Sequence, residues 1–311
     1  MSAIDVPSWA WALLGTLLLV CITIDLLAHR GEGEDTRRSA IIWSIIWIAV
    51  ALGFNAFVAV QFGRSAGEQF LAAYLLEKSL SVDNLFLFLV IFGELRIPRT
   101  EQRRVLTLGI LGALATRCLF IVLGAAAIAR WHEITYVFGA LLVVTALKLL
   151  RTPDESGEPP KALLWLERHL PWTRELHGHK FFARVKGRLV ATPLLIALIA
   201  IELTDVVFAI DSIPAAFAVS NDTFILYSSN VFAVLGLRAL YVVLANALHG
   251  LRYLRFGLSA VLAFAGIKML IASWMKFPPI VSVAVIASCI AIAIGASVMA
   301  ARREARAQQQ R

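Results

Sequence analysis

Long apolar runs constrain this chain more than any other feature. Nine segments of about 20 mostly apolar residues follow one another, and a helix of that length crosses the hydrocarbon core of a bilayer. They are 8–27, 41–62, 69–92, 105–129, 133–150, 191–219, 224–247, 254–274 and 279–300. Only 16% of the residues are charged, against about 25% in a soluble domain. We therefore predict an all-α polytopic membrane protein, a single transmembrane domain over residues 1–311, and we exclude a soluble enzyme and a nucleic-acid-binding module.

The basic residues indicate how this domain is oriented. Of the 29 Lys and Arg residues, 21 lie in alternate connections and the C-terminal tail, and 3 lie in the connections of the opposite side. Basic connections face the cytoplasm. We expect a multi-pass protein of the inner membrane, with its N-terminus outside and its C-terminus in the cytoplasm. The loop 152–190 is then cytoplasmic, and its segment KALLWLERHL predicts a short amphipathic helix along the membrane surface.

Three features of the first half of the chain recur in the second half, in the same order. They are the motifs Glu77…Asp83-Asn84 and Asp205…Asp211-Ser212, the arginines Arg117 and Arg238, and the lysines Lys148 and Lys268. Their offsets are 128, 121 and 120 residues. Because the duplicated unit has an odd number of spans, three, its two copies enter the membrane from opposite sides. We therefore predict an inverted repeat of 69–151 and 191–275, a plan typical of secondary transporters with a substrate site near the midplane.

Both copies carry charged residues inside their spans. The interior acids are Glu77, Asp83, Glu202, Asp205 and Asp211, and the interior bases are Lys78, Arg117 and Arg238. Each charge at the centre of a bilayer costs at least about 2.5–3.5 kcal/mol on insertion scales. Such residues indicate a functional site, although structural ion pairing between helices is the alternative. We expect Lys78, Arg117 and Arg238 to serve as counter-ions or in gating.

Helical geometry places several of these oxygens together. At about 100° of rotation per residue, Glu77, Ser81 and Asn84 share one helix face. Asp205 and Ser212 share the equivalent face of the second copy, with Glu202 one turn earlier. Two opposed helices would present these side chains to a common cavity. Carboxylate, amide and hydroxyl oxygens suit hard cations such as Mg²⁺, Ca²⁺ and Mn²⁺.

Asp83 and Asp211 point about 240° away from their upstream partners on an ideal helix. Two interpretations remain open for them. Pro214 would break the helix and free the carbonyl of Ile210, so that Asp211 joins the site. Otherwise Asp83 and Asp211 pair with Arg117 and Arg238.

The motifs EKSLSVDN (77–84) and IELTDVVFAIDSIPAAFA (201–218) resemble those of the TerC/Alx family of integral membrane proteins, and the resemblance covers nearly the whole chain. That family is named for an association with tellurium resistance, and its members are linked to metal-ion homeostasis, particularly Mn²⁺ efflux. The resemblance implies that the acidic motif residues carry function. These are Glu77, Asp83, Asn84, Glu202, Asp205, Asp211 and Ser212.

The leading hypothesis is therefore a transporter, not an enzyme, that exports a divalent metal, with Mn²⁺ expected first. Protons are expected coupling ions, no tightly bound cofactor is expected, and a homo-oligomer or a membrane partner protein remains open. The alternative is a non-transporting membrane scaffold in metal or tellurite stress resistance that docks a partner through 152–190. An intramembrane aspartyl hydrolase is disfavoured, because Asp205 and Asp211 lie on opposed helix faces.

Overall fold

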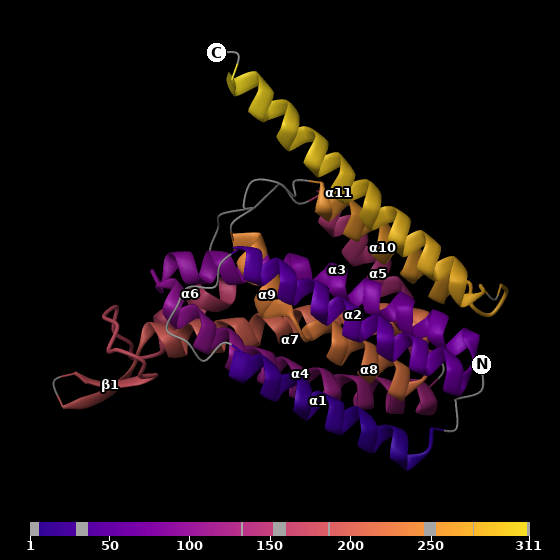
Figure 1. Ribbon diagram of the computed structural model, residues 1–311, viewed down its shortest axis with the longest axis horizontal. Helices are drawn as coiled ribbons and strands as arrows, with labels where there is room; N and C mark the ends of the chain where they lie inside the picture. Colours follow the sequence, from indigo (N-terminus) through magenta and orange to yellow (C-terminus); the bar gives the residue numbers. More distant parts are fainter. Residues whose placement is uncertain are drawn as a thin grey trace.

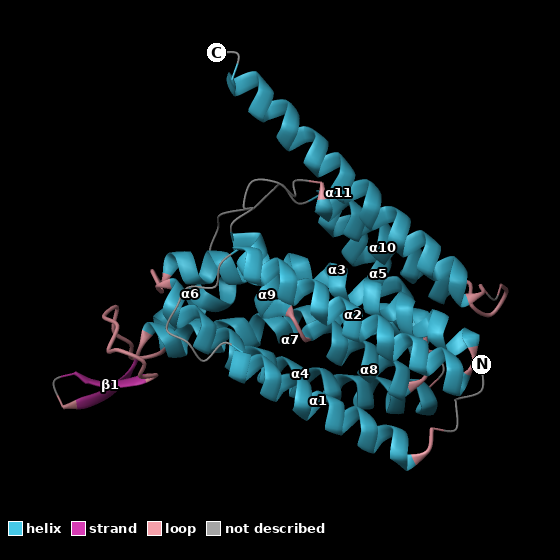
Figure 2. Ribbon diagram, viewed as in Figure 1, coloured by secondary structure: helices cyan, strands magenta, loops and turns pink. Residues whose placement is uncertain are grey.

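The computed structural model describes residues 6–28, 37–131, 133–151, 160–185, 187–245, 253–275 and 277–309. Within these ranges the chain forms helices and one small hairpin (Figures 1 and 2). The elements are α1 (Ser8–Ala28), α2 (Arg37–Phe62), α3 (Arg64–Glu94), α4 (Arg99–Arg130), α5 (Ile134–Arg151), α6 (Lys161–His169), β1 (Phe182–Val185), β2 (Arg188–Ala191), α7 (Pro193–Val219), α8 (Thr223–Val234), α9 (Leu237–Ala245), α10 (Leu254–Leu270) and α11 (Pro279–Gln309).

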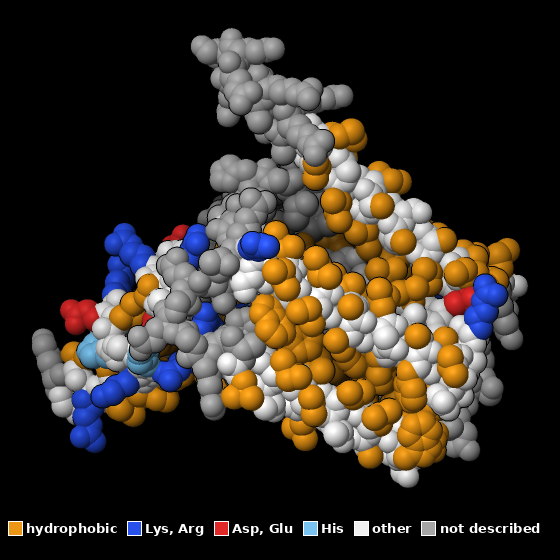
Figure 3. Space-filling view, viewed as in Figure 1, with side chains coloured by type: hydrophobic (Ala, Val, Ile, Leu, Met, Phe, Trp, Pro, Cys, Tyr) orange, Lys and Arg blue, Asp and Glu red, His pale blue; other side chains and the backbone are white. Residues whose placement is uncertain are grey.

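The outer surface of the helices is apolar. Large aliphatic side chains such as Leu19 on α1, Val60 on α2 and Ile292 on α11 are exposed. Figure 3 shows hydrophobic side chains over the body of the molecule, whereas Lys and Arg side chains gather at the end that carries α6 and β1. Since the inside holds Glu77, Arg117 and Asp205, the distribution is that of a protein whose solvent is lipid.

In the part of the chain that the structure describes, five helices are long and apolar enough to cross a membrane on their own. They are Ser8–Asp25, Arg38–Phe62, Arg99–Arg130, Pro193–Val219 and Pro279–Ala300. The pair of α8 and α9 adds a sixth if it is counted as one bent span. These helices confirm the prediction of a multi-pass membrane protein.

The two helices that carry the acidic motifs, α3 and α7, lie at the centre of the bundle and pack against each other. α3 also contacts α2, α8 and α11, and α7 contacts α4, α5 and α6. α5 and α10 form the most extensive pairing among the described helices. The bundle therefore surrounds both acidic motifs with neighbouring helices.

The predicted span 224–247 is broken rather than continuous. Asp222 caps the start of α8 by accepting hydrogen bonds from the backbone N–H groups of Phe224 and Ile225. α8 ends at Val234, and α9 leaves it at an angle of 41°. Gly236 lies at the bend with φ of 82°, and a Cβ there would come within 2.8 Å of Trp47 on α2. A positive φ and this close approach together require glycine.

α7 is a continuous helix, although one interpretation of the sequence places a break at Pro214. The helix runs from Pro193 to Val219 with Pro214 inside it. Proline in membrane helices is tolerated because neighbouring helices and local adjustments satisfy the freed backbone groups. The expected break at Pro214 is therefore wrong, and the discontinuity lies between α8 and α9 instead.

The loop 152–190 contains more structure than the sequence analysis predicts. The predicted amphipathic helix is confirmed as α6, whose Leu163 and Leu166 are buried. β1 and β2 form an antiparallel hairpin with Arg184 opposite Leu189. His179 contacts Glu101 of α4 at 2.7 Å, and the Arg104 guanidinium donates to the carbonyl of His179. These contacts fix the hairpin segment to the start of α4.

Candidate functional site

One buried arginine joins the two acidic motifs. Arg117 on α4 forms an ion pair with Glu77 on α3 through Nη1. Its Nη2 donates a 3.0 Å hydrogen bond to Oδ1 of Asp205 on α7. The three side chains are between 2% and 6% exposed. Since Glu77 and Asp205 are 128 positions apart, as the two motifs are, one cation holds the equivalent carboxylates of both motifs.

The charges in this triad do not cancel. Two carboxylates and one guanidinium leave a formal charge of −1 away from bulk water. Oδ2 of Asp205 and Nε of Arg117 are buried and make no hydrogen bond. Unsatisfied buried charged groups are costly, so a structure retains them where function requires them.

Glu202 lies one turn before Asp205 on α7 and points its carboxylate at α4. A Cβ built on Gly112 of α4 would overlap that carboxylate, so the absent side chain of Gly112 leaves the space that Glu202 fills. Oε1 of Glu202 is buried without a hydrogen-bond partner. Glu202 is among the site residues that the sequence predicts, whereas Gly112 is not, since a glycine in an apolar helix carries no local signal.

Further buried polar side chains lie on α3, α7 and α8. Ser81 and Asn84 on α3 are buried, as is Ser212 on α7. The hydroxyls of Ser81 and Ser212 have no hydrogen-bond partner. Asn230 on α8 is 2% exposed, and both polar atoms of its side-chain amide are unpartnered. Sequence reasoning missed Asn230, although a polar amide inside an apolar run is a usable signal.

The two downstream aspartates differ from the expectations. Asp211 is half-buried and accepts a 2.9 Å hydrogen bond from Thr145 on α5, away from Arg117. The side chain of Asp83 lies outside the part of the chain that the structure describes. The proposed pairing of Asp211 with Arg117 or Arg238 is wrong, because Arg117 binds Glu77 and Asp205 and Arg238 binds Asp25.

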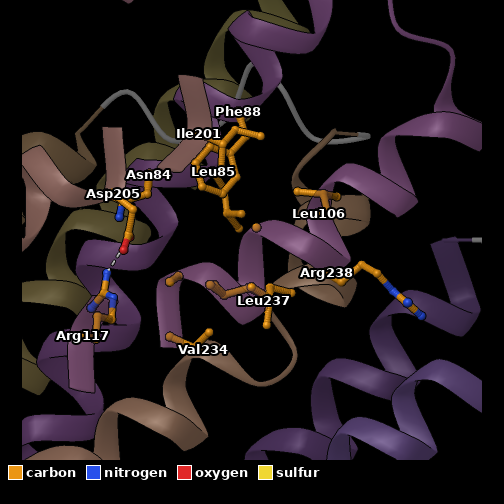
Figure 4. Close-up of a pocket in the computed structure, with 13 residues that line it drawn as sticks. Asn84, Leu85, Phe88, Leu106, Arg117, Ile201, Asp205, Val234, Leu237 and Arg238 are labelled. Atoms are coloured by element: carbon orange, nitrogen blue, oxygen red, sulfur yellow. Dashed lines mark hydrogen bonds and ion pairs between the residues drawn. The ribbon is translucent and has the colours of Figure 1, made fainter. Parts of the chain in front are cut away.

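A narrow crevice leads away from the triad. Asn84, Arg117 and Asp205 line one end of it, and Arg238 on α9 lines the other (Figure 4). Apolar side chains form the walls between them, among them Phe88, Leu106 and Leu237. The space accommodates about one water molecule. At the Arg238 end, its Nη1 lies 3.4 Å from Oδ2 of Asp25 on α1.

Lys78 is the basic residue of the first acidic motif, and its side chain contacts the end of α8. Its Nζ donates a 3.1 Å hydrogen bond to the carbonyl of Ala233, in the last turn of α8. A cation at a helix C-terminus interacts favourably with the exposed carbonyls and the helix dipole. Lys78 therefore connects α3 to the position where α8 ends.

The structure brings together Glu77, Asp205 and Arg117, with Glu202 one turn away. Within the described residues, no three Asp, Glu, His or Cys side chains converge closely enough to hold a metal ion. Arg117 occupies the position between the two carboxylates. The oxygens are therefore present, but a metal would need them rearranged around it.

Comparison with known proteins identifies the family. A family profile described as integral membrane protein TerC family matches residues 62–305. The chain belongs to this family. It is 46% identical over 295 residues to "Uncharacterized membrane protein STKORF319" of Myxococcus xanthus, covering 94% of this chain and 92% of that protein. It is 42% identical over 288 residues to "Putative membrane-bound redox modulator Alx" of Escherichia coli (strain K12), covering 89% and 90%.

More distant members extend the same relationship. An "Uncharacterized membrane protein" of Rickettsia bellii is 33% identical over 293 residues, which cover 93% of this chain and 97% of that protein. No solved structure matches the chain. The TerC resemblance in the two acidic motifs is thus confirmed over most of the sequence.

Proposed function

We propose that this TerC-family protein is a secondary-type transporter, and not an enzyme, that exports a divalent metal ion, with Mn²⁺ as the expected cargo. The observation that carries the proposal is the buried pair of equivalent carboxylates, Glu77 and Asp205, on two central helices. Intramembrane carboxylates that face a bundle interior mark ion pathways. Asn84, Glu202 and Ser212 supply further oxygens of the kind that Mn²⁺, Mg²⁺ and Ca²⁺ accept.

The arrangement of the helices supports an inverted repeat of 69–151 and 191–275. Under that repeat α3 corresponds to α7, α4 to α8 with α9, and α5 to α10. α3 packs against α8 as α7 packs against α4, and α5 packs against α10. Each of these contacts has the partner that a pseudo-twofold axis requires.

The crossing of α5 and α10 supports the same repeat at the level of residues. A Cβ on Gly266 would lie 2.7 Å from the carbonyl of Gly139, so the two backbones approach closely there. A shift of 120 residues converts Gly139 to Ser259 and Ala146 to Gly266. Ser259 donates a 2.8 Å hydrogen bond to the carbonyl of Ala146. The shift of 120 residues therefore relates the Gly139–Gly266 contact to the Ser259–Ala146 contact. The same shift relates Lys148 to Lys268.

The proposed path begins in the cytoplasm. Counting α3, α5 and α10 as spans beside the six described above gives the nine-span topology, with the N-terminus outside and the C-terminus inside the inner membrane. In that topology Phe88, Leu106 and Asp25 lie in the cytoplasmic half. The crevice between Arg238 and the triad then leads from the cytoplasmic side to the site. Rocking of the repeats would expose the site to the opposite side.

The broken helix supports the transport interpretation. Discontinuous helices in transporters place helix ends and unwound backbone near the binding site. The end of α8 at Val234 lines the crevice, and Lys78 binds the carbonyl of Ala233 beside it. Protons are the proposed coupling ions, because carboxylates inside a membrane mark proton relays as well as ion pathways.

Metal flux into liposomes tests the proposal. Purified protein is reconstituted, and Mn²⁺ transport is followed with and without an imposed pH gradient, with Ca²⁺ and Mg²⁺ as competitors. We expect Mn²⁺ flux above that of protein-free liposomes, accelerated by the gradient. No flux with folded protein would favour the scaffold alternative. In that case Glu202→Gln would lower stability with no specific metal phenotype.

A further inference from the structure

We propose that Arg117 is a tethered internal cation that competes with the transported metal for Glu77 and Asp205. The inference rests on the proposed function and adds to it a residue that sets metal affinity and release. Its basis is geometric, because the guanidinium contacts both carboxylates at once. A metal that used these two carboxylates as ligands would need the position that Arg117 holds.

Repulsion between cations favours exchange over joint occupancy. A metal ion bound between Glu77 and Asp205 would lie beside the guanidinium that now contacts both carboxylates. A divalent cation and a guanidinium repel each other more strongly in a low-dielectric interior than in water. The metal and the guanidinium are therefore alternative partners, and each stabilises the carboxylates when the other is absent.

The repeat makes the position of Arg117 specific. Arg238 is the residue of the second repeat that corresponds to Arg117, 121 positions later in the sequence. Its guanidinium binds the Asp25 side chain and backbone carbonyl on α1, outside the proposed repeats. Glu77 and Asp205 therefore share Arg117 rather than having one arginine each, and a single side chain controls both.

The crevice marks the direction in which Arg117 can move. Arg117 lines it beside Asp205, and Asn84 supplies a polar neighbour there. Nε of Arg117 has no hydrogen-bond partner in its present position. Since the crevice accommodates about one water molecule, the guanidinium leaves the carboxylates only when the crevice widens, and it returns when the metal departs.

Mn²⁺ binding to purified protein tests the proposal, with Arg117→Met and the wild type titrated calorimetrically at equal ionic strength. If the carboxylates are free of Arg117 in about a tenth of the molecules, its removal tightens apparent affinity about tenfold. Arg117→Met should also lower both KM and kcat for flux, because the bound metal loses its internal competitor. Unchanged or weaker Mn²⁺ binding by folded Arg117→Met would overturn the proposal.

Two further variants complete the test. Lys78→Met also removes a buried cation, but one that binds the carbonyl of Ala233 rather than a carboxylate. We expect it to tighten Mn²⁺ binding much less than Arg117→Met, and an equal gain would assign the effect to net charge and overturn the proposal. Arg117→Lys keeps the charge but cannot hold both carboxylates as a guanidinium fork does. It should bind Mn²⁺ more tightly than the wild type, even if Arg117→Met fails to fold, and equal or weaker binding would contradict the competition.

The results also separate this inference from the proposed function. Wild-type Mn²⁺ flux without tighter binding in the Arg117 variants would reject only the competition. Absence of Mn²⁺ binding and flux in the wild type and in every Arg117 variant would reject the transporter itself.

Discussion

Arg117 donates a 3.0 Å hydrogen bond to Asp205, and this contact joins the middle of α4 to the middle of α7. Through the same guanidinium, Asp205 is linked to Glu77 on α3. Three helices are thus connected by one ion-pair network that is shielded from solvent. The network stabilises the bundle and also presents the charges from which a transport site is proposed.

Asp205→Ala should destabilise the protein by about 1–3 kcal/mol, because it leaves a buried N–H donor of Arg117 without its acceptor. Unfolding in detergent, followed by circular dichroism, measures the loss. Glu68→Ala is the matched control, since Glu68 pairs with Arg64 at an exposed position on α3. An exposed pair contributes less than about 1 kcal/mol. Equal losses in the two variants would contradict the assigned role of the network.

Gly112→Ala should disturb the position of Glu202. The added Cβ overlaps the carboxylate, so we expect a loss of about 1–3 kcal/mol and slower Mn²⁺ flux. Thermal unfolding and flux are measured together. Gly53→Ala on α2 is the control, because its Cβ would meet no atom within 4 Å. A Gly112→Ala protein as stable and active as Gly53→Ala would show that Glu202 does not need this space.

Gly236→Ala should lower stability at the bend between α8 and α9. The left-handed backbone costs a residue with a Cβ about 1–2 kcal/mol, and the contact with Trp47 adds to this. Thermal unfolding of the variant measures the loss. In a Trp47→Ala background the steric contact is absent, so Gly236→Ala should cost less than in the wild type but still about 1–2 kcal/mol. No loss from Gly236→Ala in that background would show that the backbone conformation is not constrained there.

Arg238→Gln should lower the KM for Mn²⁺ about fivefold. Arg238 is buried at the proposed cytoplasmic end of the crevice, and the Asp25 carboxylate offsets part of its charge, so we expect a remaining repulsion of the metal of about 1 kcal/mol. Initial rates over a range of Mn²⁺ concentrations give the KM. Arg64→Gln, on an exposed part of α3, is the matched control and should leave KM unchanged. A KM that is unchanged or raised in Arg238→Gln would place the path elsewhere.

The sequence predicts the parts of this protein that depend on composition and periodicity. Among the described residues, apolar runs identify the five helices and the bent pair of α8 and α9 that are apolar enough to cross a membrane. The rotation of about 100° per residue in a helix separates Asp205 from Asp211. The structure agrees, because Asp205 contacts α4 and Asp211 contacts α5. The burial of Glu77, Asn84 and Ser212 on the faces assigned to them follows from the same geometry.

Other features depend on contacts between distant segments, which local patterns do not encode. At the bend, Gly236 packs so closely against Trp47 of α2 that a Cβ would not fit. The choice of Asp25 as the partner of Arg238 depends on where α1 packs. The β1–β2 hairpin was missed, although Gly187, with φ of 79°, marks a turn between two short strands of alternating character. Pro214 does not break α7, because neighbouring helices accommodate it.

The most direct test of the central claim is Mn²⁺ flux by Glu77→Gln and Asp205→Asn in proteoliposomes, beside the wild type and Glu68→Gln. Each substitution keeps the size of the side chain and removes one carboxylate charge, and Glu68→Gln does so at the edge of the same helix as Glu77. The account predicts that either site variant abolishes flux in folded protein, while Glu68→Gln transports at the wild-type rate. Wild-type flux in Glu77→Gln or Asp205→Asn would contradict it.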